Sequence, residues 1–69
     1  MKLVTFEIQD GENSYEQYSI LEKDLSEKET IDEVYGNDRD DRWYKVASIQ
    51  DITKQEASIL QKLNIAYFQ

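Results

Sequence analysis

The stretch Trp43-Tyr44-Lys45-Val46-Ala47-Ser48-Ile49, which continues to Ile52, decides the predicted fold. It contains the only tryptophan and several residues with high strand propensity, and it lies between two segments with helix signals. We therefore expect it to be the central strand of a sheet. Both faces mix apolar and polar side chains, so the pattern leaves open which face is buried. We favour Tyr44 and Val46 facing the helices, with Trp43 covering the edge.

A β-hairpin is predicted before this strand. Residues 3–9 alternate between apolar and polar side chains, which is typical of a half-buried strand. The pair Asp10-Gly11 is a turn signal inside a predicted loop of about five residues. Residues 15–22 form the predicted return strand. The residues expected on the buried face of this hairpin are Val4, Phe6, Ile8, Tyr18 and Ile20.

Two short helices are predicted from their capping signals. Asp24 or Ser26 begins the first, because each has a glutamate three residues later, and Gly36 ends it. Thr53 and Glu56 form the capping box of the second helix. The apolar faces consist of Ile31, Val34 and Tyr35 in the first helix, and of Ala57, Leu60 and Leu63 in the second, with Ile59 beside them.

The end of the chain is apolar. Asn64 can end the second helix in the left-handed conformation. Residues 65–68 contain no charge and two aromatic residues, so we expect a last strand or a segment packed on the core. The element order is then β-β-α-β-α with a short C-terminal strand as an option. We predict one small α+β domain over residues 1–69, with a mostly antiparallel sheet of three to four strands and both helices on one face.

The composition argues against an enzyme, a cofactor site and a metal site. Cysteine and histidine are absent, and only two glycines are present, which excludes thiolate ligands, histidine bases and glycine-rich phosphate loops. A pair of carboxylates used for acid-base chemistry needs a cleft that buries one of them, and so short a chain offers little cleft. We therefore predict no catalytic residue, no cofactor-binding residue and no metal ligand.

The charged loop 37–42 contains Asp38, Asp40 and Asp41, as a calcium loop would. Counted from Asp38, however, the sixth and twelfth positions are Trp43 and Ile49 instead of glycine and glutamate. We interpret the loop as a solvated turn with local arginine-aspartate pairs.

The net charge of −7 belongs entirely to the first half of the chain. Residues 1–35 hold ten acidic residues and three lysines, whereas residues 36–69 hold five acidic and five basic residues. This balance argues against direct binding to nucleic acid or to anionic membranes, and it favours a basic protein surface as partner. No apolar run approaches the ~20 residues of a membrane span, and acidic residues interrupt the N-terminal segment. We expect a cytoplasmic protein.

The acidic residues of the first helix are the favoured contact surface. Asp32 and Glu33 lie near the helix C-terminus, where the helix dipole disfavours negative charge, so local stability does not explain them. The predicted partner-binding residues are Glu29, Asp32 and Glu33, then Glu12 and Glu16 of the hairpin, and the aromatic residues Tyr15 and Trp43.

These observations predict a non-enzymatic acidic binding module or inhibitor that occupies a basic site on a partner protein. In size and charge the chain is similar to small acidic phage and plasmid proteins, including nucleic-acid mimics and anti-CRISPR inhibitors. The alternative is a structural protein that forms a homodimer through its tyrosine-rich sheet and apolar tail. Binding through acidic residues weakens with salt, whereas an apolar dimer does not.

Overall fold

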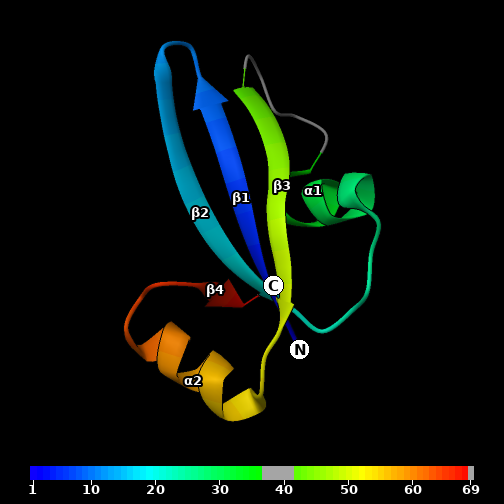
Figure 1. Cartoon of the computed structure of the whole chain (residues 1–69), viewed down its shortest axis with the longest axis vertical. Helices are drawn as coiled ribbons and strands as arrows, with labels where there is room; N and C mark the ends of the chain where they lie inside the picture. The colour runs from blue at the N-terminus through cyan, green and yellow to red at the C-terminus, as the bar shows by residue number, and fades with distance from the viewer. Residues whose placement is uncertain (37–41, 69) are drawn as a thin grey trace.

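The chain folds into a β-sheet packed against two helices (Figure 1). The structure, a computed structural model, describes residues 1–36 and 42–68. The elements are β1 (Lys2–Asp10), β2 (Asn13–Leu21), α1 (Glu27–Tyr35), β3 (Arg42–Asp51), α2 (Lys54–Lys62) and β4 (Tyr67–Phe68). The sheet order is β3-β1-β2-β4, in which β1 pairs antiparallel with β2 and β3, and β4 pairs parallel with β2. The predicted α+β class and the β-β-α-β-α order are confirmed.

The central strand is β1, and the prediction that residues 43–49 occupy the centre is wrong. β1 pairs along its whole length with β2 on one side and β3 on the other, so β3 lies at the edge of the sheet. The physical reason is that Val4, Phe6 and Ile8 of β1 are fully buried, whereas most of β3 is exposed. The preference for Tyr44 and Val46 facing a helix agrees with the structure, since both pack against the cluster under α1.

The hairpin between β1 and β2 is tighter than predicted. Asp10 pairs with Asn13, so the turn consists of two residues, and Gly11 has a φ of 63° that glycine adopts without strain. The predicted loop of five residues implied a register shifted by one residue. A shift of one residue moves every side chain of the strand to the other face. Tyr18 and Ile20 therefore lie on the face opposite Val4, Phe6 and Ile8, and that part of the prediction is wrong.

Both helices begin at their predicted capping boxes. The Ser26 hydroxyl accepts from the Glu29 backbone N–H, and Thr53 does the same for Glu56, while each glutamate side chain accepts from the backbone N–H of its cap. Gly36 ends α1 with a φ of 72°. Asn64 has a φ of 55°, which agrees with its predicted left-handed conformation after α2.

The two helices cover opposite faces of the sheet, and the prediction that they share one face is wrong. Alternate residues of a strand point to opposite faces, so β1 contributes to two apolar clusters. The cluster under α1 contains Val4, Phe6, Ile8, Leu21 and Ile31, with Val34, Tyr35, Tyr44 and Val46 packed against it. The cluster under α2 contains Ile20, Ala57 and Ala66, with Met1, Leu3, Tyr18, Ile52 and Leu60. Leu3 and Ile20 make the face opposite α1 apolar at the end of the sheet where they lie, and α2 covers this apolar area.

The outer edge of β3 is partly closed by α1. The backbone N–H of Val46 donates to the Glu27 carboxylate at 3.3 Å, so one of the edge donors has a partner from the first turn of the helix. Charged groups on edge strands discourage pairing with another chain. The predicted turn at 37–42 lies outside the described residues except for Arg42, whose Nε donates to Asp10 at 3.2 Å.

The C-terminal tail is docked on the sheet. The backbone N–H groups of Ile65 and Ala66 donate to the Leu60 carbonyl at 3.0 and 3.4 Å, and the Ala66 side chain is buried. The strand that follows is limited to the two residues of β4. Leu63, which was predicted to face the core, is 62% exposed, because the chain leaves the helix there and Ala66 fills the position against Ile20 instead.

We predict that Ala66→Glu destabilises the protein, whereas the neighbouring change Ile65→Glu has a small effect. A carboxylate at position 66 would be buried against Ile20 without a partner, but Ile65 is already half exposed. Thermal unfolding followed by circular dichroism measures both. For a domain of this size ~1 kcal/mol lowers the melting temperature by about 4–8 °C, and Ala66→Glu should exceed that loss. Equal melting temperatures for the two variants would show that the tail is not docked.

We also predict that the protein loses stability between about pH 10 and pH 12 through Tyr35. Burial, followed by the nearby Tyr44 and Tyr15, raises the pKa of Tyr35 from 10.0 to about 12. The raised pKa means that the folded state favours the protonated phenol. The stabilisation is therefore complete below pH 10 and is lost as the pH rises towards 12.

The Tyr35 hydroxyl donates to the Gln17 side chain at 2.8 Å, and its ring packs edge-on against Phe6 at 5.0 Å. Tyr35→Phe keeps the ring contact and removes the phenol. Its melting temperature should fall less between pH 9 and pH 11 than that of the wild type. The same fall in both proteins would assign the alkaline loss of stability to other groups.

Candidate partner-binding surface

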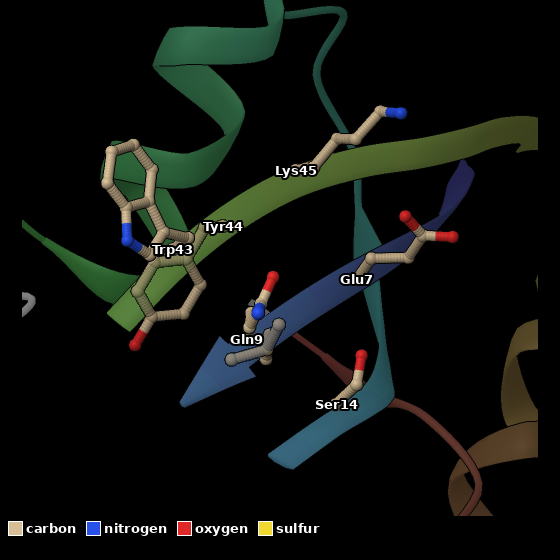
Figure 2. Close-up of a pocket in the computed structure, with 7 residues that line it drawn as sticks. Glu7, Gln9, Ser14, Trp43, Tyr44 and Lys45 are labelled. Atoms are coloured by element: carbon tan, nitrogen blue, oxygen red, sulfur yellow. The ribbon is translucent and has the colours of Figure 1, made fainter. Parts of the chain in front are cut away.

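The face of the sheet opposite α1 is left uncovered beyond the end that α2 occupies. Two cross-strand rows lie there, one of Ser14, Gln9 and Trp43 and the other of Glu16, Glu7 and Lys45. All six side chains are exposed. Figure 2 shows a depression on this part of the sheet, with lining residues from β1, β2 and β3. We call these six residues the open sheet face.

The alternation of β1 places this face. Val4, Phe6 and Ile8 are buried under α1, so Glu7 and Gln9 must point to the other side of the sheet. The two-residue turn then sets the partners of these residues on β2. The antiparallel return of β3 adds Trp43 beside Gln9 and Lys45 beside Glu7. The open sheet face therefore follows from the same burial that forms the core.

Glu7 and Glu16 stand directly opposite each other in the register of β1 and β2. Two carboxylates in this arrangement repel each other and destabilise the strand pair. Lys45 lies on the other side of Glu7, so the row of three has a net charge of −1. Two carboxylates that face each other on an uncovered surface attract positively charged groups.

Tyr18 holds one oxygen of Glu16. Its hydroxyl donates to Glu16 Oε2 at 3.2 Å, and the negative charge of Glu16, followed by this hydrogen bond, raises the pKa of Tyr18 above 10.0. The hydrogen bond fixes the direction of the carboxylate along β2. The carboxylate of Glu16 is therefore held in a defined position on the open sheet face.

Trp43 presents a large aromatic surface in the cross-strand row next to this acidic pair. Its side chain is 78% exposed, so the expectation that it covers the sheet edge is wrong. Its register partner on β1 is Gln9, a polar residue that gives the indole ring no apolar support. An aromatic face next to carboxylates binds a guanidinium or ammonium group by combining cation–π attraction with an ion pair.

The acidic residues predicted on α1 have local structural roles. Glu29 accepts from the Ser26 backbone N–H, and its contact with Ser26 lowers the pKa of its carboxyl group. Asp32 is partly buried, and Glu33 lies 3.9 Å from the Lys23 ammonium. These three residues stay a predicted contact surface that is separate from the open sheet face.

The other predicted partner-binding residues lie in three different parts of the structure. Glu12 lies in the turn of the hairpin, and Tyr15 is opposite Ile8 on the face that α1 covers. Of the predicted residues, only Glu16 and Trp43 lie on the open sheet face. Sequence reasoning missed Glu7 and Lys45, although the alternation of residues 3–9 already placed Glu7 opposite the buried face.

Two properties of the described ranges, 1–36 and 42–68, bear on other kinds of site. No group of three or more acidic, histidine or cysteine side chains in these ranges is arranged to hold a metal ion. Within the same ranges, neither the length nor the hydropathy of any helix suits it to crossing a bilayer.

Comparisons of the chain with protein-family models, with curated proteins and with solved structures found no match.

We predict that Glu16→Gln raises the melting temperature by a few degrees. The change removes the repulsion across the Glu7 pair and keeps a side-chain oxygen that can accept from Tyr18. The pKa of Tyr18 should also move back towards its ordinary value, which an ultraviolet pH titration measures.

The matched control for this change is Glu12→Gln. It alters the net charge equally but lies in the exposed turn, outside the paired positions of β1 and β2. An equal rise in melting temperature for both variants would assign the gain to the lower net charge of the whole chain.

Proposed function

We propose that this chain is a non-enzymatic acidic binding module or inhibitor that occupies a basic site on a partner protein through its open sheet face. The observation that supports the proposal is the juxtaposition of Glu7 and Glu16, directly opposite each other, with the exposed Trp43 in the neighbouring cross-strand row. The pair costs the free protein stability, and a cation from a partner removes that cost. The two carboxylates therefore destabilise the free chain but stabilise a complex with a positively charged group.

Arginine is the side chain that fits this arrangement best. A guanidinium is planar, so it stacks on an indole ring while its N–H groups donate to a carboxylate. On the open sheet face the ring comes from β3 and the carboxylates come from β1 and β2. A single arginine lying across the strands can contact Trp43 and Glu7, and a neighbouring basic residue of the partner can contact Glu16.

A protein site that normally holds nucleic acid is a natural target of this chemistry. Such sites concentrate arginine and lysine side chains that bind phosphates. The net charge of −7 would guide the chain towards such a site over a distance and increase the rate of association at low salt. In this proposal the chain acts as an inhibitor by occupying the site that nucleic acid would use.

The proposal assigns no reaction to the chain. Within residues 1–36 and 42–68, the carboxyl groups with a shifted pKa are those of Glu29 and Asp51. Both pKa values are lowered, by the contact with Ser26 and by the hydrogen bond from Lys2 respectively. A general acid at neutral pH needs a shift in the other direction. The shifts therefore reflect local pairing and not acid-base chemistry.

The test uses Trp43 as a reporter, because it is the only tryptophan. A short peptide of alternating arginine and glycine should change the fluorescence of Trp43 in a saturable way. The same peptide with citrulline in place of arginine, which has the same shape without the charge, should not. Added salt should steeply weaken the binding of the arginine peptide, because the Debye length falls to about 8 Å at 0.15 M.

Two variants with equal charge locate the surface. Glu7→Gln/Glu16→Gln should weaken binding several-fold at low salt, whereas Glu22→Gln/Glu33→Gln, which removes two acids elsewhere, should have a small effect. Equal affinity of the wild type and Glu7→Gln/Glu16→Gln would contradict the proposal. Selective weakening by the second variant would instead assign binding to the acidic residues around α1.

A further inference from the structure

One lateral face of α2 remains apolar and uncovered. Ile59 is 50% exposed and Leu63, one helical turn further on, is 62% exposed. A scattered apolar residue on a surface is ordinary, but these two are adjacent. Ile59 also borders a groove that continues the apolar surface towards β3, and the groove is lined by Leu3, Gln50, Ile52, Glu56, Ile59 and Leu60.

The charge around this face differs from that of the chain as a whole. Between residues 52 and 66 the charged side chains are Lys54, Glu56 and Lys62, which give a net charge of +1 in a chain of −7. Two copies of so acidic a chain repel each other at most orientations. Contact through α2 brings less repulsion than contact through the acidic first half of the chain.

The face is also complementary to itself. Glu56 and Lys62 each lie three residues from Ile59, in opposite directions along the helix. When two copies of α2 lie antiparallel with their Ile59 side chains in contact, Glu56 of each copy stands opposite the lysine at position 62 of the other. Gln55 and Leu63, each four residues from Ile59, oppose each other in the same way. A two-fold axis thus produces one apolar contact between the two Ile59 side chains, two contacts of Leu63 with Gln55, and two ion pairs from one short helix.

We propose that this face of α2, formed by Gln55, Glu56, Ile59, Lys62 and Leu63, is a homodimer interface in which two copies of α2 pack antiparallel about Ile59. The Glu56 carboxylate accepts from the Thr53 backbone N–H through Oε1 at 2.9 Å, and this leaves its other oxygen for the second copy. The proposal is independent of the open sheet face, since its residues are different. The nine residues of α2 span about 13.5 Å, so the contact is small and the dimer is weak and dependent on concentration.

Sedimentation equilibrium over a wide range of concentration tests this interface. The wild type should show a monomer–dimer equilibrium, and Lys62→Glu should weaken the dimer about tenfold, because both symmetry-related pairs become repulsive. Lys54→Glu is the matched control: it changes the net charge equally but lies on another side of α2. A wild type that stays monomeric, or equal weakening by both variants, would overturn the proposal.

Mixing two variants gives a sharper result. In Lys62→Glu both positions 56 and 62 are acidic, and in Glu56→Lys both are basic. Two copies of the same variant therefore repel each other at these positions. An equimolar mixture should form a heterodimer more tightly than either variant dimerises alone. Absence of any gain on mixing would overturn the pairing of Glu56 with Lys62.

Glu56→Lys removes the capping box of α2, so its fold must be checked by circular dichroism. If that variant does not fold, Ile59→Lys decides the question, since its side chain is half exposed and the change should be tolerated by the monomer. Two lysines would then face each other on the axis, and the dimer should be lost. Dimerisation equal to that of the wild type would place the interface elsewhere.

Discussion

The burial of three alternate side chains of β1 beneath α1 is the constraint on which the rest of this structure depends. Val4, Phe6 and Ile8 are almost inaccessible to solvent, and the rings of Phe6 and Tyr35 pack edge to face with their centroids 5.0 Å apart. Burying each such side chain contributes about 1.5–3 kcal/mol. Small domains have a total stability of about 5–15 kcal/mol, so these three residues contribute an amount comparable to the whole. Their position makes β1 the centre of the sheet, with β2 and β3 on either side.

The open sheet face is a consequence of this burial. Once the even-numbered residues of β1 face α1, Glu7 and Gln9 must face away from it. Strands of nine residues extend over about 30 Å, whereas the nine-residue helix α2 extends over about 13.5 Å. α2 therefore covers the end of the sheet near Leu3 and Ile20 and leaves the rows of Glu7 and Gln9 uncovered. The surface proposed to bind a partner exists because the second helix is too short to cover its face.

Features set by neighbouring residues could be predicted from the sequence. The capping boxes of Ser26 and Thr53 and the end of α1 at Gly36 depend on contacts within a few residues, and the structure has all of them. The register of the hairpin could not be predicted in the same way. Taking Asp10-Gly11 as part of a five-residue loop shifted the pairing by one residue, which exchanged the two faces of β2 and hid the Glu7–Glu16 pair.

The position of β3 depends on contacts that are distant in the sequence. Its mixed faces reflect an edge strand with an irregularity in its pairing: Thr5 pairs with Ser48 and Phe6 with Val46, which leaves Ala47 without a register partner.

The open sheet face and α2 lie towards opposite ends of β1, since Gln9 and Leu3 are six residues or about 20 Å apart on that strand. Two copies joined through α2 would each carry an open sheet face on the same side of the sheet as α2. A weak dimer of this kind would carry two open sheet faces. A partner with two basic sites within reach of both faces would be bound more tightly than a partner with one, without any new kind of contact.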